Sequence, residues 1–125
     1  MKDVEWWCST QPMQQGAAPL TRVAELAIDP AHLQEFKLAL HEGIETSVHT
    51  EPGVLALYAV SLKENPSLVL VFEMYKDEAA YDSHRETAHF KKFSEITGKM
   101  VRSRKFLDVD PIMLGAKAHW ANAGD

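Results

Sequence analysis

The stretch of sequence that decides the fold is VLALYAVSLKENPSLVLVFEMY, Val54 to Tyr75. Two apolar runs, Val54 to Leu62 and Leu68 to Tyr75, flank a polar segment in which Asn65-Pro66 is a turn signal. The stretch therefore predicts a β-hairpin. Because both runs are apolar at odd and even positions alike, we expect both faces of the sheet that contains them to be covered.

The residues before the hairpin predict a strand and then a helix. LTRVAELAI, Leu20 to Ile28, has the composition of a strand, and it is followed by Asp29-Pro30, a helix cap and a residue suited to a first helical turn. From there a helix is predicted to about His49, where the Glu51-Pro52-Gly53 segment ends it. One face of this helix carries apolar residues at helical spacing: Leu33, Phe36, Leu40, Ile44 and Val48.

The residues after the hairpin complete the pattern. Asp77 is placed to cap a short helix through Arg85, and a further helical run follows Thr87 with His89, Phe93, Ile96 and Met100 on one side. A last strand is predicted from about 103 to 109. The order βαββαβ indicates an α+β, ferredoxin-like domain over residues 20–110. Residues 1–19, which include Trp6 and Trp7, are expected to form an N-terminal extension, and residues 111–125 a C-terminal arm.

Because both faces of the predicted sheet are apolar, the sequence also bears on how the protein assembles. A single domain of 125 residues has one layer of helices, which covers only one face of the sheet. The other apolar face is most economically buried against the same face of a second copy. We therefore expect a homodimer.

Composition narrows the functional classes. The net charge of -5 comes from interspersed acids and bases, which argues against nucleic acid as a partner. No apolar run is long enough for a membrane helix and no signal-peptide pattern is visible, so we expect a cytoplasmic protein without membrane contact. Cys8 has no second cysteine to pair with. Motifs for nucleotide cofactors, zinc peptidases and serine hydrolases are absent from the sequence.

Two histidines, His84 and His89, are the first candidates for chemistry. His89 shares the apolar side of its helix with Phe93, so its ring should face the sheet; the simplest interpretation is a core histidine bonded to a backbone carbonyl. His84 lies three residues after Tyr81 and shares a helix face with it. Its simplest interpretation is a partly exposed residue at a helix end.

Glu73 is the odd member of an apolar strand. By alternation it shares a face with Val69, Val71 and Tyr75, either toward a pocket or toward the dimer partner. Burial would raise its pKa and suit it to act as a general base. Alternatively, it is a structural carboxylate paired with Arg22, Arg102 or Arg104. Tyr58 would also reach a cavity if alternation along its strand turns it toward the face that contains the cavity. His41, Glu45 and His49 are interpreted as a solvated helix face rather than a metal site.

The segment from Glu51 to Phe93 resembles the antibiotic biosynthesis monooxygenase (ABM) superfamily, especially its quinol monooxygenase-like members. The shared elements are an E-x-G before a strand, a hairpin whose second strand ends in Tyr, and an H-x-x-T-x-H-F-K segment that begins at His84. The resemblance implies a ferredoxin-like protomer, a dimeric α/β barrel formed sheet to sheet, and a pocket between helices and sheet.

What the resemblance implies for function is a cofactor-independent monooxygenase of a quinol-like or other enolisable small molecule, with molecular oxygen as co-substrate and no metal or other cofactor. A base is needed because an ionised substrate gives an electron to oxygen most readily, and imidazole suits this task at neutral pH. The expected catalytic residues are His84 as base with His89 and Glu73, and the expected substrate contacts are Tyr75, Tyr58, Tyr81 and Phe93.

The superfamily leaves other functions open. It includes an isomerase of a phosphorylated quorum-sensing sugar, which also begins with proton removal, and a phosphorylated substrate would need cations such as Arg85, Lys91, Arg102 or Arg104. A non-catalytic ligand-binding module on the same scaffold is the third alternative. Haem-degrading members use an Asn on the first strand, where this chain has RVAEL. Haem degradation is therefore not expected.

Overall fold

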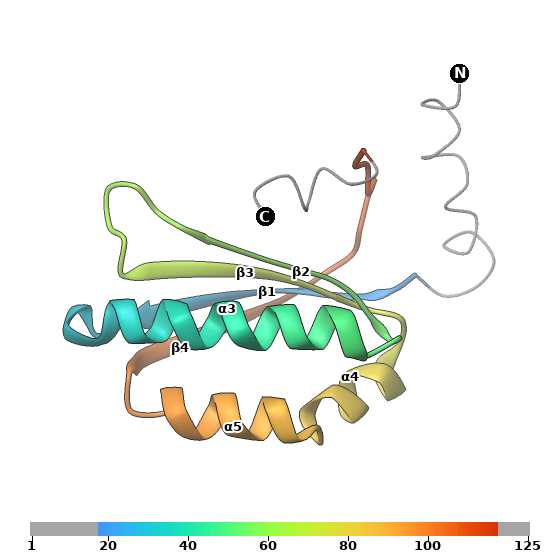
Figure 1. Ribbon diagram of the computed structural model, residues 1–125. Helices are drawn as coiled ribbons and strands as arrows, with labels where there is room; N and C mark the ends of the chain where they lie inside the picture. The colour runs from blue at the N-terminus through green and yellow to red at the C-terminus, as the bar shows by residue number, and fades with distance from the viewer. Residues whose placement is uncertain (1–17, 118–125) are drawn as a thin grey trace.

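The computed structural model describes residues 18–117, which form one antiparallel sheet with helices packed on it (Figure 1). The strand order is β2-β3-β1-β4. The four strands are β1 (Leu20–Ile28), β2 (Val54–Ser61), β3 (Leu68–Tyr75) and β4 (Val101–Val109). This arrangement confirms the predicted α+β, ferredoxin-like fold and the hairpin of β2 and β3. Trp6 and Trp7 of the predicted N-terminal extension, and Cys8, lie outside the described residues.

The helices lie together on one face of the sheet (Figure 1). They are the 3-10 turn η1 (Pro30–His32), α3 (Leu33–Thr50), α4 (Glu78–Arg85) and α5 (Ala88–Thr97). The first helix was expected to begin at Pro30, but its first turn is 3-10, with the Asp29 carboxylate accepting a hydrogen bond from the Ala31 amide. Within residues 18–117, no helix is long and apolar enough to cross a membrane.

The core lies between the sheet and α3. Cross-strand pairing places Ala24 beside Val71 and Leu26 beside Val69, so these residues share the face toward the helices. Phe36 of α3 is fully buried among them. Two residues predicted on the apolar helix faces, Val48 and Ile96, are instead 44% and 40% exposed. Met100 is buried as expected, but it lies beyond the end of α5 and the turn rather than the helix positions it.

The opposite face of the sheet is also apolar, and we call it the outer face. Its centre is Phe72, which pairs with Val23 on one side and with Tyr58 on the other. The rings of Tyr58 and Phe72 stack with centroids 6.0 Å apart. Val60 is 57% exposed on this face. No helix of residues 18–117 covers the outer face, which agrees with the prediction that the helices cover one face of the sheet.

Gly53 sets how closely the loop before β2 approaches α4. A Cβ added at Gly53 would lie 2.5 Å from the Cβ of Ala80, and the Gly53 carbonyl accepts a hydrogen bond from the Lys76 amide, so the loop is held in place. We expect Gly53→Ala to lower the free energy of unfolding by about 1–3 kcal/mol through overpacking. Denaturant unfolding measures this change.

The control for Gly53→Ala is the double variant with Ala80→Gly, which removes the clashing methyl group. It should recover part of the loss, although glycine inside a helix itself costs about 1 kcal/mol relative to alanine. A Gly53→Ala protein as stable as the wild type would contradict the close contact.

Candidate active site

A cavity of about 210 Å³ lies between the helix-covered face of the sheet and the helices. Its walls are mainly apolar, with residues from α3, α5 and the strands. Polar groups gather in one part of the lining, where β3 and α4 contribute Glu73, Tyr75, Tyr81 and His84, and α5 contributes His89. A small apolar chamber with a few convergent polar groups is typical of a ligand site.

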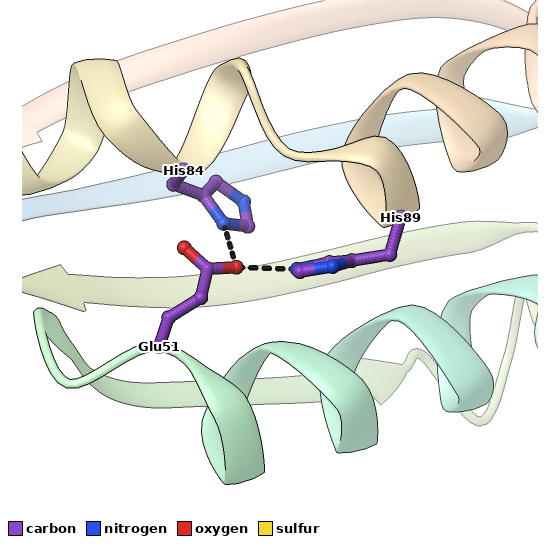
Figure 2. Close-up of side chains that lie close together, drawn as sticks. All are labelled: Glu51, His84 and His89. Carbon is purple, nitrogen blue, oxygen red and sulfur yellow. Dashed lines mark hydrogen bonds and ion pairs between the residues drawn. The ribbon is translucent and has the colours of Figure 1, made fainter.

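Glu51 joins the two histidines (Figure 2). Its Oε2 atom lies 2.9 Å from Nδ1 of His84 and 2.5 Å from Nε2 of His89. Glu51 is the first residue after α3, while the histidines come from α4 and α5, so three elements meet at one oxygen atom. His84 is 6% exposed, which places its ring inside the protein rather than in solvent.

The charge of this cluster follows from its hydrogen bonds. Burial raises the pKa of the Glu51 carboxyl, but hydrogen bonds and positive charge from His84 and His89 outweigh it, and the pKa is lowered overall. An ionised carboxylate only accepts hydrogen bonds, so both imidazoles present an N–H to Glu51. In neutral His84 the proton is therefore on Nδ1, which leaves the lone pair on Nε2.

Thr87 lies at the break between α4 and α5. Its hydroxyl donates to the carbonyl of His84 and accepts from the amide of Phe90, so it ends one helix and caps the next. Asp77 caps the start of α4 in the same way through the Ala80 amide. The break at Thr87 lets two histidines five positions apart point at a common carboxylate.

A second polar pair lies on β3. The Tyr75 hydroxyl donates a hydrogen bond of 2.9 Å to Oε1 of Glu73. Burial raises the pKa of Glu73, and the opposing effects of Tyr75, Arg22 and His84 do not cancel it. Burial and the neighbouring Glu73 likewise raise the pKa of Tyr75. The Glu73 carboxyl thus gives up its proton less readily than a solvated glutamate does.

The three arginines that were considered as partners of Glu73 each have different contacts. Arg102 contacts Asp29 at 3.3 Å instead. The guanidinium of Arg22 lies between the rings of Tyr81 and Phe106, 4.7 and 4.6 Å from their centroids, and its charge favours ionised Glu73 from a distance. Arg104 lines the cavity. Glu73 is therefore bonded to a tyrosine rather than paired directly with an arginine.

Replacing Glu73 should change how stability depends on pH. Because its folded pKa is raised above 4.5, ionising it costs stability, and this cost grows as pH rises from about 4.5 through the folded pKa. Glu73→Gln removes the cost. We expect the difference in melting temperature, variant minus wild type, to be more positive at pH 8 than at pH 4.

The control for this prediction is Glu64→Gln, which changes an exposed carboxylate in the hairpin turn. Its melting temperature difference should vary little over the same pH range. A Glu73→Gln difference that is equally flat would contradict a raised pKa.

The structure brings together most of the predicted site residues. Those that line the cavity are His84, His89, Glu73, Tyr75, Tyr81 and Phe93. Tyr58 does not line it, because its ring stacks on Phe72 at the outer face. The simplest interpretations of the histidines were wrong: His84 is buried, and His89 is bonded to a carboxylate rather than to a carbonyl.

Glu51 is the member of the site that sequence reasoning missed. It was interpreted only as part of the segment that ends a helix, although it is also the first residue of the E-x-G motif. A polar residue within that motif was the available signal. Its partners lie 33 and 38 residues away in sequence, beyond the range of any local pattern.

Comparisons with known proteins agree with this architecture. The profile of a family described as "Antibiotic biosynthesis monooxygenase" matches residues 19–96. A candidate antibiotic biosynthesis monooxygenase from Bacteroides thetaiotaomicron is 46% identical, with a TM-score of 0.76 over 79% of this chain and 94% of that one. No match was found among curated proteins.

Two further solved structures have lower identity. A candidate monooxygenase from Lactobacillus acidophilus is 27% identical, with a TM-score of 0.69 over 78% of this chain and 50% of that one. A candidate antibiotic biosynthesis monooxygenase from Caulobacter crescentus is 24% identical, with a TM-score of 0.67 over 74% and 91% of the two chains. The Caulobacter protein supports the fold alone.

Proposed function

This chain belongs to the antibiotic biosynthesis monooxygenase family, and from that premise we propose that it is a cofactor-independent monooxygenase of a quinol-like or other enolisable small molecule. The observation that carries the proposal is the hydrogen bond from buried His84 to Glu51 at the wall of an apolar cavity. This arrangement supplies a base, an anion to stabilise its protonated form, and a chamber with mainly apolar walls.

The first step is removal of a substrate proton by Nε2 of His84. When this atom accepts the proton, the ring becomes a cation whose Nδ1–H already donates to the Glu51 carboxylate. The carboxylate therefore stabilises the product of proton transfer and holds the ring in the correct tautomer. A positioned base of this kind typically contributes about a hundredfold to ten-thousandfold to rate.

The second step uses the resulting anion. One electron passes from the enolate or phenolate to molecular oxygen, and the substrate radical and superoxide then combine to form a C–O bond. For a substrate carbon that carries two hydrogens, loss of water from the peroxide gives a carbonyl: R₂CH₂ + O₂ → R₂C=O + H₂O. One oxygen atom enters the product and the other leaves as water. The apolar walls exclude bulk water from the intermediates.

The remaining polar groups orient the substrate. The Glu73 carboxyl, held by the Tyr75 hydroxyl, lines the cavity and offers a polar group that orients a hydroxyl of the substrate. Tyr81 and Phe93 offer aromatic surfaces for a planar ring. His89, bonded to the same oxygen of Glu51 as His84, helps to fix the position of the carboxylate.

The experiment that tests the proposal is oxygen uptake with a panel of quinols and anthrones, combined with ¹⁸O₂ labelling of the product. A monooxygenase should consume one O₂ per product and place one labelled atom in it. Exchange of substrate protons with solvent and no oxygen uptake would favour the isomerase, and binding without either reaction would favour a ligand-binding module. Both results would contradict the proposal.

We also propose that the protein is a homodimer joined through its outer faces. Support comes from Val60, Leu70 and Phe72, which present apolar side chains on a face that no helix of residues 18–117 covers. Charge within such an interface would be left unpaired. We expect Val60→Asp to weaken association by about a hundredfold, measured by size-exclusion chromatography with light scattering.

The matched control for Val60→Asp is Leu38→Asp. Leu38 is 73% exposed on α3, on the opposite side of the sheet, so this variant should remain dimeric. A wild-type protein that is monomeric at micromolar concentration would end the dimer proposal.

A further inference from the structure

The cluster at Glu51 has the composition of a metal site as well as that of a base and its carboxylate. We propose that Glu51, His84 and His89 bind a divalent transition metal ion of the Zn²⁺ class, and that the bound ion switches off His84 as a base. The second half rests on the function proposed above. The first half, binding, stands on the geometry alone.

The geometry needs little adjustment to accept an ion. One ligand atom from each of the three residues lies within 4.8 Å of the other two. Around a tetrahedral zinc ion with bonds of about 2.1 Å, neighbouring ligand atoms are about 3.4 Å apart. The Glu51 oxygen is now 2.9 and 2.5 Å from the two nitrogens, so each of these two distances would lengthen by less than about 1 Å to admit an ion.

The backbone already holds the three ligand residues close together, so small movements of their side chains are enough to bind an ion. Each ligand comes from a different element, and Figure 2 shows all three side chains converging on one point. His84 is held at the end of α4 by the Thr87 cap, while His89 is less buried and freer to adjust. The arrangement is thus preorganised to bring three ligands to one ion without refolding.

The donor atoms select the class of ion. Two imidazole nitrogens and one carboxylate oxygen suit Zn²⁺, Co²⁺ or Ni²⁺, whereas Mg²⁺ and Ca²⁺ prefer oxygen ligands throughout. The carboxylate supplies one negative charge to offset the two positive charges of the ion. Three protein ligands also leave a coordination position open for water or for an oxygen atom of a ligand in the cavity.

Metal binding would reverse the tautomer of His84. Without an ion, Nδ1 carries the proton that is donated to Glu51, and the lone pair is on Nε2. A metal ion that binds Nδ1 needs the lone pair of that atom, so the ring proton must then be on Nε2. The nitrogen that would accept the substrate proton then has no lone pair. Occupancy and base activity are mutually exclusive.

The binding test uses the full chain after treatment with chelator, titrated with ZnCl₂ by calorimetry. We expect one ion per chain, with at least tenfold weaker binding for Glu51→Gln and for His89→Ala. Co²⁺ should give visible absorption bands typical of low coordination number in the wild type and lose them in these variants. Thermal unfolding of both variants shows whether each is folded, and Glu51→Gln, which keeps the shape of the side chain, is the safer of the two.

The matched controls are His41→Ala and Cys8→Ser. His41 lies at the exposed surface of α3 near Glu45, so it represents adventitious binding by a surface histidine, and Cys8 represents binding by the thiol. Both variants should bind Zn²⁺ as the wild type does. Loss of binding in either control, retention in Glu51→Gln, or no uptake of Zn²⁺ at micromolar concentration would overturn the proposed site.

The activity test adds Zn²⁺ during oxygen uptake. We expect inhibition at one ion per chain that a chelator reverses, with the half-inhibiting concentration matching the calorimetric Kd. Binding without inhibition would overturn the switch and leave the oxygenase proposal intact. Binding by a protein that consumes no oxygen with any substrate would overturn the switch and the oxygenase proposal together, and leave the metal site intact.

Discussion

His84→Ala should lower kcat for oxygen uptake by about a hundredfold to ten-thousandfold, the range expected when a positioned general base is removed. The reason is specific to the ring: its Nδ1 is bonded to Glu51 and its Nε2 is the only nitrogen left for the substrate. The measurement is steady-state oxygen consumption with whichever quinol or anthrone the wild-type protein turns over. Substrate binding should change less than kcat, because the apolar walls remain.

Two further variants separate loss of the base from loss of structure. His84→Asn keeps a group that can donate to Glu51 but has no basic nitrogen, so its activity should be as low as that of His84→Ala. His41→Ala removes an exposed histidine of α3 and should leave the rate unchanged. Oxygen uptake by His84→Ala within a few fold of the wild type would remove His84 from the mechanism.

Phe36→Ala should lower the free energy of unfolding by about 3–5 kcal/mol. The side chain is fully buried in the core between α3 and the sheet, and the centroid of its ring lies 6.0 Å from that of the Phe93 ring. Truncation leaves a void that the surrounding strands and helices fill only in part. Against a typical total of about 5–15 kcal/mol, this is a large fraction of the stability. Urea unfolding followed by circular dichroism measures it.

Leu38→Ala is the matched control, because Leu38 is on the same helix but 73% exposed. Its effect should stay within about 0.5 kcal/mol. Because Phe36 also lines the cavity, its truncation should in addition weaken binding of an aromatic substrate in the fraction that remains folded. Equal effects of the two truncations would show that Phe36 does not anchor the core.

The elements of the fold could be predicted because their signals are local. The hairpin from Val54 to Tyr75 follows from two apolar runs around Asn65-Pro66, and β3 has the predicted bounds. The geometry of the first helical turn could not be predicted, since Asp29 and Pro30 favour a first turn without deciding between 3-10 and α geometry. Glycine at the end of α5 explains why Met100 is positioned by a turn.

The site was only partly predictable. Glu73 stood out because a carboxylate interrupts an apolar strand, and alternation placed it correctly beside Tyr75. Tyr58 could not be placed, because β2 is apolar on both parities and its pairing with β3 shifts between Val54 and Ala56. Glu51 was missed because its partners come from other helices, and only the tertiary fold brings them to it.

The sharing of one carboxylate oxygen by two imidazoles has a consequence for evolution. Substitution of either histidine leaves the Glu51 carboxylate short of a donor, and substitution of Glu51 leaves both rings without their acceptor. Descendants of this protein should therefore inherit the trio intact or replace it wholesale, and mixed versions should be rare among its relatives.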